Sequence, residues 1–281
     1  MGHMGAGAAQ IPQGPQPLPG VAYVVAVGSG KGGVGKTTVA VNLAVALGKL
    51  GHRVGLLDAD IYGPNVPTMM GMTRPPNMVA EDRIGPLTAH GVKFISIGLL
   101  APGDKPMVMR GPMLHQIIRQ FLQQVEWGEL DFLIVDLPPG TGDVVISLVQ
   151  TVPLTGAVVV STPSDVSLQD ARKAIEMFSQ VKVEVIGLVE NMGRFTCPHC
   201  HQEVDIFSSG GTERTAGQFG LEFLGSLDLD PAIREGGDRG LPVTLAGPES
   251  AAAKPFYDVA RKVAARAQEI AASSEQIMEI S

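Results

Sequence analysis

The amino-acid sequence predicts an α/β protein whose doubly wound, mostly parallel sheet carries helices on both faces. Three observations predict this fold class. Short, almost wholly apolar runs recur along the chain, as expected for strands buried on both faces. Segments with apolar residues at helical spacing lie between most of these runs, an alternation typical of parallel sheets. Hydrophobic residues make up 44% of the 281 positions and aromatic residues only 5%, which favours a core of Val, Ile, Leu and Ala.

The predicted elements follow one another along the chain. We expect strands at residues 23–27, 53–57, 94–97, 132–135, 157–160 and 185–189. We expect helices at residues 37–50, 113–125, 167–181 and 255–278. Ser167 and Asp170 form a candidate capping box for the third helix. Residues 63–91 are rich in Pro, Met and Gly without a period, which predicts a long surface loop of a kind that is often functional.

Composition limits the domain organisation and the partners. Residues 1–20 are expected to be a flexible leader, in which Met1 to Met4 match the remnant of an expression tag, and residues 21–281 a single domain. With two cysteines, no signal-peptide pattern and no run of eighteen apolar residues, the sequence predicts a cytoplasmic protein without a membrane segment. The formal charge of −7 argues against nucleic acid as a partner.

A glycine-rich segment between the first predicted strand and helix fits the phosphate-binding pattern G-x-x-x-x-G-K-[ST]. Its glycines let backbone N–H groups point at phosphate oxygens, and the helix start adds the positive end of its dipole. Lys36 is expected to reach the β and γ phosphates of ATP, and the Thr37 hydroxyl to bind Mg²⁺. The expected nucleotide-binding residues here are Gly30, Lys31, Gly32, Gly33, Val34, Gly35, Lys36, Thr37 and Thr38.

Lys31 is a second lysine in this loop, which the ordinary motif does not require. The segment resembles the deviant Walker A class of P-loop ATPases. That resemblance implies that Lys31 crosses a dimer interface and neutralises charge at the partner's nucleotide, as an arginine finger does. Without it, a solvated surface lysine is the simpler interpretation.

Polar residues end three predicted strands. Asp136 closes an apolar run in the Walker B pattern, which predicts that it holds Mg²⁺ through water. Asp58 and Asp60 share one side of an extended segment, so both could approach the phosphates. The class resemblance implies that Asp60 orients the attacking water, that Asp58 lies near Mg²⁺, and that Asn191 binds the adenine edge. Simple caps of strand ends and turns are the alternative for each.

Both cysteines lie in Cys197-Pro198-His199-Cys200. A thioredoxin-like redox pair requires a helix after the first cysteine, whereas residues 201–207 resemble a strand, and a disulfide is disfavoured in a reducing compartment. Zinc and iron–sulfur clusters usually take four ligands, so a twofold dimer contributing two cysteines per chain is the simplest metal site. His199 and His201 could complete a mononuclear site, although such close neighbours tend to point away. Zinc and a cluster both remain open.

Taken together, the segments at 30–38, 58–65, 110–113, 136–143 and 197–200 resemble the Mrp/ApbC family of P-loop ATPases, which carry iron–sulfur clusters. The resemblance extends from Val21 to about Ala265. It implies a homodimer that bridges a [4Fe–4S] cluster through Cys197 and Cys200 of both chains, hydrolyses ATP, and delivers the cluster to apo-proteins. His201 departs from the family pattern, because relatives often have Gly there.

Four functions are compatible with these sequence features. The first is an ATP-dependent cluster carrier in which Lys31, Lys36 and Asp60 are catalytic. The second is a partitioning or positioning ATPase acting on DNA or a membrane, which leaves the cysteine pair without a role. The third is an ATPase with a structural zinc at its dimer interface. The fourth is an ATP-driven reductase, for which the sequence indicates no electron acceptor.

Overall fold

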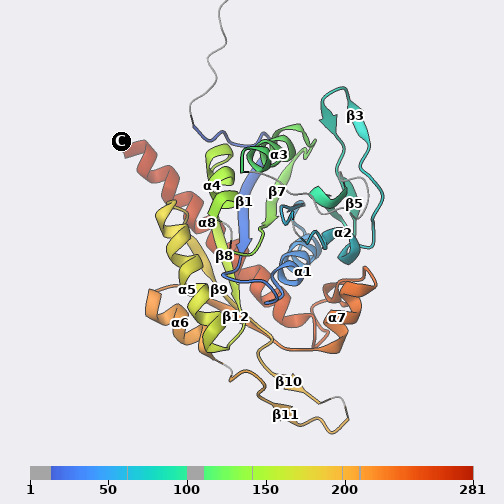
Figure 1. Ribbon diagram of the computed structural model, residues 1–281, viewed down its shortest axis with the longest axis vertical. Helices are drawn as coiled ribbons and strands as arrows, with labels where there is room; N and C mark the ends of the chain where they lie inside the picture. The colour runs from blue at the N-terminus through green and yellow to red at the C-terminus, as the bar shows by residue number, and fades with distance from the viewer. Residues whose placement is uncertain are drawn as a thin grey trace, which may run out of the picture.

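The computed structural model describes residues 14–61, 63–99, 111–140, 142–197, 199–208 and 210–280. Its centre is an eight-stranded sheet in the order β12-β9-β8-β1-β7-β2-β6-β5, in which only the edge strand β5 runs antiparallel to its neighbour (Figure 1). The strands of this sheet are β1 Val21–Gly28, β2 Val54–Asp58, β5 Leu87–Ala89, β6 Val92–Ser96, β7 Leu130–Asp136, β8 Gly156–Ser161, β9 Val185–Asn191 and β12 Phe223–Leu227. The predicted fold class is confirmed.

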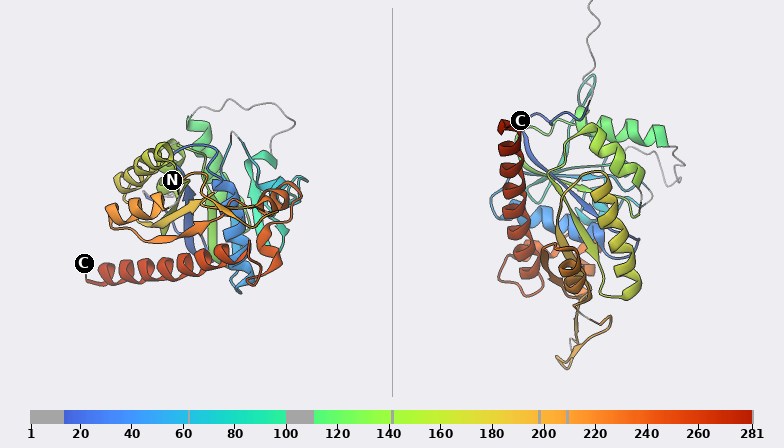
Figure 2. Two further views of the ribbon diagram at one scale, coloured as in Figure 1. Left: turned by 90° about the horizontal axis from the view of Figure 1, so that it is seen from below. Right: turned by 90° about the vertical axis from the view of Figure 1, so that its left-hand side faces the viewer.

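Helices cover both faces of the sheet (Figure 2). Within β1, Val25 and Val27 belong to one apolar cluster, and Val24 and Ala26 to the other, because successive side chains of a strand point to opposite faces. One cluster includes helices α1 Lys36–Lys49 and α8 Lys254–Ile280. The other includes α3 Gly111–Gln124, α4 Gly142–Thr151, α5 Asp165–Gln180 and α6 Gly211–Phe219.

The predicted capping box is wrong. Helix α5 begins at Asp165, with Ser164 in the N-cap position, so Ser167 lies inside the first turn. The Ser167 hydroxyl is instead used to hold the end of β8: it accepts hydrogen bonds from Ser161 Oγ at 3.1 Å and from the backbone N–H of Thr162 at 3.2 Å. A serine pattern alone cannot distinguish these two uses of one hydroxyl.

The prediction of a long surface loop at residues 63–91 is also wrong, because short helical and strand elements interrupt these residues. Prolines and glycines there separate elements too short to produce a hydrophobic period. These elements are α2 Val66–Met69, β3 Met78–Ala80, β4 Arg83–Ile84 and strand β5. Further elements had no clear sequence signal: β12, α4, α6, α7 Pro231–Asp238 and the 3₁₀ turns η1 Ile97–Leu99 and η2 Val243–Ala246.

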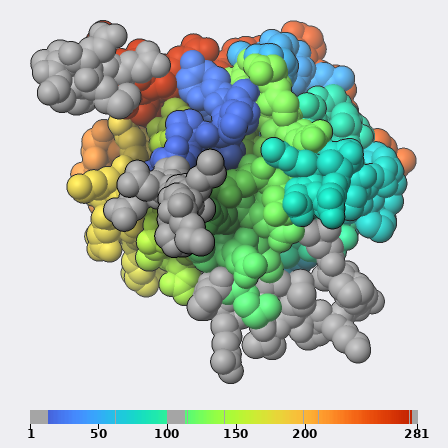
Figure 3. All heavy atoms as spheres, turned by 90° about the horizontal axis from the view of Figure 1, so that it is seen from above, coloured from blue at the N-terminus to red at the C-terminus, as the bar shows by residue number. Residues whose placement is uncertain are grey.

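The carboxyl ends of the parallel strands meet at one edge of the molecule. From this edge a two-stranded hairpin, β10 Phe195–Thr196 and β11 Glu203–Val204, extends away from the body (Figure 1). The opposite end of the molecule is formed by the beginning of the described chain and by segments from its middle (Figure 3). Among the described helices, none combines the length and the apolar character needed to cross a membrane.

Candidate functional site

The loop between β1 and α1 requires glycine at defined positions. Gly33 and Gly35 have φ angles of 81° and 79°, in the left-handed region that glycine adopts without strain. Gly30 is needed for a different reason, because a Cβ there would lie 2.0 Å from the backbone oxygen of Asp170 in α5. The loop is therefore wrapped tightly around the start of α1, with its backbone against a neighbouring helix.

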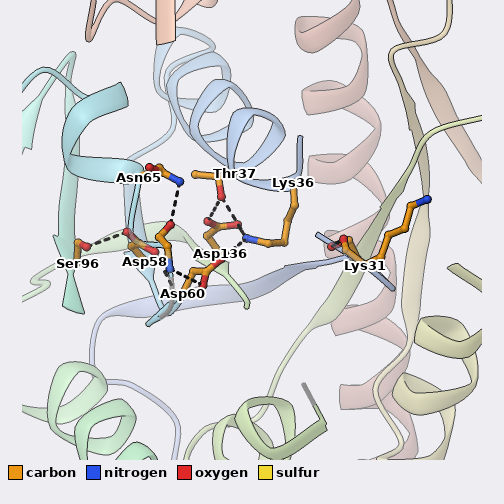
Figure 4. A network of polar contacts seen from close by, with 10 residues as sticks. Lys31, Lys36, Thr37, Asp58, Asp60, Asn65, Ser96 and Asp136 are labelled. Atoms are coloured by element: carbon orange, nitrogen blue, oxygen red, sulfur yellow. Dashed lines mark hydrogen bonds and ion pairs between the residues drawn. The ribbon is translucent and has the colours of Figure 1, made fainter. Parts of the chain in front are cut away.

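Lys36 and Thr37, the first residues of α1, converge on Asp136 at the end of β7 (Figure 4). Lys36 Nζ lies 2.6 Å from Asp136 Oδ1 and 3.6 Å from Asp60 Oδ2. Thr37 Oγ1 donates to Asp136 Oδ2 at 2.7 Å. Burial raises the pKa of Asp136, and the charge of Lys36 opposes that shift. The lysine compensates a carboxylate that water does not reach.

Asp58 is fully buried at the end of β2, where it pairs with Asp136 in the register of β2 and β7. Ser96 Oγ donates to Asp58 Oδ2 at 2.8 Å, and the Asp60 backbone N–H donates to Asp58 Oδ1 at 3.1 Å. Burial and the nearby Asp136 charge raise the pKa of Asp58 to about 8. Asp58 therefore supports the backbone of Asp60, and its role toward Mg²⁺ stays a prediction.

Asn191 ends β9 beside the same loop. Its Nδ2 donates to the backbone oxygen of Val34 at 2.8 Å. A Cβ on Gly35 would lie 2.2 Å from this Nδ2, so the close approach of Asn191 needs the glycine. The structure thus brings Asn191 to the phosphate-binding loop, and its contact with adenine stays a prediction.

A cavity of about 750 Å³ lies at this edge, within the ~300–1,000 Å³ typical of ligand pockets. Lys31, Lys36, Thr37, Thr38, Asp60 and Asn191 are among its lining residues. Unlike Lys36, Lys31 points away from the acidic cluster (Figure 4). The far wall is formed by Asp228, Leu229, Asp230, Ile233 and Arg234, from the segment after β12 and from α7.

Sequence reasoning missed this far wall. One local signal was present: Asp230 caps α7 by accepting from the Ala232 N–H at 2.7 Å, and Pro231 occupies the first helical turn. That Asp-Pro pair predicts a helix start. Its place in the site, however, depends on the parallel pairing of β12 with β9, which no local pattern contains.

The cysteine pair lies in the turn between β10 and β11. Cys197 is partly buried and Cys200 is exposed, and both are free thiols. Backbone N–H groups of Cys200 and His199 hydrogen-bond the Cys197 sulfur and lower the pKa of its thiol. The turn is closed by bonds from the Cys197 N–H to the Gln202 oxygen and from the His201 N–H to the Cys197 oxygen. The turn therefore presents two free thiols, and the pKa of the Cys197 thiol is the lowered one.

His201 has a φ of 56°, so the chain is left-handed at the position where the family resemblance implies Gly. That preference has a backbone explanation and needs no ligand role for His201. Within the described residues, no group of three or more His, Cys, Asp or Glu side chains is arranged to hold a metal ion. Some motif residues lie outside the described residues, among them Arg110, Thr141 and Pro198.

A strand, a glycine-rich loop and a helix that place a lysine and a hydroxyl beside a strand-end aspartate define a P-loop NTPase. Residues 20–264 match the ParA model described as NUBPL iron-transfer P-loop NTPase, and the chain belongs to that family. The resemblance inferred from the sequence is confirmed. The family comprises iron–sulfur cluster carrier and transfer proteins built on an ATPase fold.

Individual relatives and solved structures are consistent with this family. The chain is 51% identical to the iron-sulfur cluster carrier protein of Aquifex aeolicus over 246 residues, 87% of this chain and 68% of the relative. It is 46% identical to the mouse iron-sulfur cluster transfer protein NUBPL over 253 residues, 89% and 79% of the two chains. A nucleotide-binding protein of Archaeoglobus fulgidus, solved with ADP, has 38% identity and a TM-score of 0.70, covering 79% of this chain and 88% of its own.

A septum site-determining protein shares the fold as well. The septum site-determining protein MinD of Pyrococcus horikoshii, solved with Mg-ADP, is 26% identical, with a TM-score of 0.66 over 86% of this chain and 96% of its own. The fold alone therefore does not separate cluster carriers from positioning ATPases. The cysteine hairpin is the feature of this chain that needs an explanation beyond nucleotide binding.

Proposed function

We propose that this protein is an ATP-dependent iron–sulfur cluster carrier. Two copies would hold one [4Fe–4S] cluster through Cys197 and Cys200 of each chain and deliver it to apo-proteins. One observation carries the proposal: the cysteine pair lies on a hairpin that leaves the sheet at the edge that also forms the nucleotide cavity (Figure 1). A positioning ATPase would give this hairpin no task.

The nucleotide part of the proposal follows from the residues around Lys36. Gly30 to Thr38 would surround the phosphates of ATP, with Lys36 on the β and γ groups. When Lys36 turns to phosphate, its ammonium group would leave Asp136 Oδ1 and Asp60 Oδ2. Asp60 would then orient the attacking water, and Asn191 would bind the adenine edge.

The donor set fits Mg²⁺. The hydroxyl of Thr37 and the carboxylate of Asp136 are oxygen donors 2.7 Å apart beside the cavity, and Mg²⁺ takes oxygen ligands. The ion would supply neutralisation of the phosphate charge. Asp58 is the predicted neighbour of this site, acting through the Asp60 backbone that it accepts from.

The cargo part rests on counting ligands. A four-cysteine cluster needs two more thiolates than Cys197 and Cys200 provide, and a second copy supplies them by symmetry. The exposed position of Cys200 suits a cluster that must be passed on. Lys31, which points away from its own acidic cluster, would complete the nucleotide site of the second copy. Hydrolysis would move the two half-sites together or apart.

Anaerobic reconstitution with iron and sulfide tests the proposal. We expect broad visible absorbance, about four irons per dimer, and transfer to an apo-protein substrate that requires a [4Fe–4S] cluster. The Cys197→Ala/Cys200→Ala variant should lose both while keeping nucleotide binding. A colourless dimer that takes about one zinc and no cluster would instead make the hairpin a structural zinc site. A monomer with full cluster content would contradict the shared site.

A further inference from the structure

We infer that Glu190 is a positioning residue that couples the nucleotide cavity to the cysteine hairpin. The inference rests on the proposed function only in taking the cavity as the nucleotide site and the two thiols as the cargo site. Glu190 is 1% exposed and immediately precedes Asn191 at the end of β9. A buried carboxylate is costly unless its oxygens are well satisfied, so its partners indicate what it holds.

The partners of Glu190 lie where the hairpin returns to the body. Oε1 accepts from the Gly210 N–H at 3.2 Å, and Oε2 accepts from the Thr212 N–H at 3.1 Å. Ser226 Oγ in β12 donates to Oε1 at 3.2 Å. In the described part of the chain no lysine, arginine or histidine pairs with this carboxylate. Glu190 therefore joins three segments, β9, β12 and the start of α6, by hydrogen bonds alone.

The outgoing limb of the hairpin is held beside the same carboxylate. The Gly193 N–H donates to the Leu227 oxygen at 2.9 Å, and the Leu229 N–H donates to the Arg194 oxygen at 2.8 Å. A Cβ on Gly193 would lie 2.2 Å from Ser226 Oγ and 3.4 Å from Glu190 Oε1. Both limbs of the hairpin thus meet around Glu190, without room for a larger residue at Gly193.

The nucleotide cavity begins one residue away. Asn191 donates to the Val34 oxygen in the phosphate-binding loop at 2.8 Å, and Leu229, which holds Arg194, lines the cavity wall. Successive side chains of a strand point to opposite faces, so β9 presents Asn191 to the loop and Glu190 to the hairpin base. A nucleotide that shifts either the loop or the cavity wall would therefore strain the hydrogen bonds that Glu190 accepts.

Thiol labelling of the reduced, metal-free protein tests the inference. The labelling rate of the cysteine pair with a maleimide is measured without nucleotide and with saturating Mg²⁺ and a non-hydrolysable ATP analogue. We expect the nucleotide to change the rate by about fivefold or more, the lower end of typical site-to-site coupling. Glu190→Gln retains the side-chain size but places an NH₂ donor against a backbone N–H. In this variant the ratio should fall to near one while analogue affinity stays within about threefold.

Glu203→Gln is the matched control. Glu203 lies on the hairpin, and its exposed carboxylate pairs with the Arg194 guanidinium at 3.2 Å. No described interaction joins its side chain to Glu190, Gly210, Thr212 or Ser226. It should retain the wild-type ratio. If Glu190→Gln does not fold, Ser226→Ala removes one of the three hydrogen bonds and should reduce the ratio at least twofold.

Two outcomes would overturn the inference. One is a wild-type ratio of one, which shows that no coupling exists. The other is an unchanged ratio in folded Glu190→Gln or in Ser226→Ala. Neither result touches the carrier function, because cluster content and transfer are measured separately. Conversely, a protein that labels as expected but takes up no cluster would contradict the carrier function and leave Glu190 as the coupling residue.

Discussion

Lys36 Nζ lies 2.6 Å from Asp136 Oδ1, and these two residues, 100 positions apart in sequence, form a buried ion pair beside the cavity. Under the proposed function, the phosphates of ATP would compete with Asp136 for the same ammonium group. Lys36 supplies the counter-charge to the buried Asp136 carboxylate, and Asp136 holds the Lys36 side chain in place. Removal of the pair should affect stability and nucleotide binding in different ways.

Lys36→Met should abolish measurable ATP binding and lower the free energy of unfolding by about 3 kcal/mol, because it leaves a buried carboxylate without its cation. Urea unfolding and titration with a fluorescent nucleotide measure the two effects. Adding Asp136→Asn should restore most of the stability and none of the binding. Lys49→Met, an exposed position on the same helix, is the control. A loss of stability below about 1 kcal/mol would contradict the role assigned to the pair.

Lys31→Ala should lower kcat for ATP hydrolysis at least about a hundredfold, with little change in KM, if Lys31 acts on the partner's nucleotide. Mixing Lys31→Ala with Asp60→Asn tests this, since neither variant alone should hydrolyse ATP efficiently. Random assortment makes half of the dimers mixed, each with one complete site, which restores roughly a quarter of wild-type activity. An inactive mixture of exchanged dimers would place Lys31 in its own site.

Asp58→Asn should change the pH dependence of stability. The folded pKa of about 8 lies above the unfolded value of about 4, so the folded protein holds a proton that the unfolded chain releases. The Asp58 contribution to stability is present below the unfolded pKa and is lost as pH rises toward 8. Urea unfolding in EDTA should therefore show the variant gaining on wild type from pH 5 to pH 8.

Asp131→Asn is the control for that measurement. Arg53 lowers the pKa of Asp131, so this carboxylate is ionised in both the folded and the unfolded state above pH 5. The difference from wild type should stay constant between pH 5 and pH 8. A constant difference for Asp58→Asn as well would show that the Asp58 carboxyl is ionised in the folded protein at neutral pH.

His201→Gly should leave metal binding intact. A non-glycine residue in the left-handed region costs roughly 1–2 kcal/mol, so the change relaxes the turn that carries the thiols. We expect Zn²⁺ affinity, measured by chelator competition, to stay within about threefold or to rise, and His201→Val to weaken it. A tenfold loss in His201→Gly would instead identify the imidazole as a ligand.

Gly30→Ala and Gly32→Ala should differ sharply in stability without nucleotide. The new Cβ at Gly30 would lie 2.0 Å from the Asp170 oxygen, whereas at Gly32 its nearest contact is Pro139 Cγ at 3.8 Å. We expect a loss of about 3 kcal/mol or more for the first and a change within about 0.5 kcal/mol for the second. Thermal unfolding of both variants measures the two losses of stability. A loss for Gly30→Ala as small as that for Gly32→Ala would show that the loop moves away from α5.

The parts of this protein that depend on local interactions can be predicted from the order of its residues. A phosphate-binding loop is recognisable because strand, glycines, lysine and helix are consecutive, and buried parallel strands are recognisable because they are apolar throughout. Lys36, Thr37 and the cysteine pair could be identified for the same reason. The limits of local patterns are visible at Ser167. The sequence pattern fits a helix N-cap, whereas in the structure the hydroxyl accepts hydrogen bonds at the end of β8.

Contacts between residues far apart in the sequence depend instead on how the whole chain folds. The register of β2 and β7 places Asp58 opposite Asp136, and the pairing of β12 with β9 brings α7 to the cavity and Ser226 to Glu190. Such pairings depend on strand order and on the packing of whole layers, which satisfy buried polar groups across the sheet. A sequence pattern extends over a few neighbouring residues, so it can indicate that a strand ends in a carboxylate but not what that carboxylate will hold.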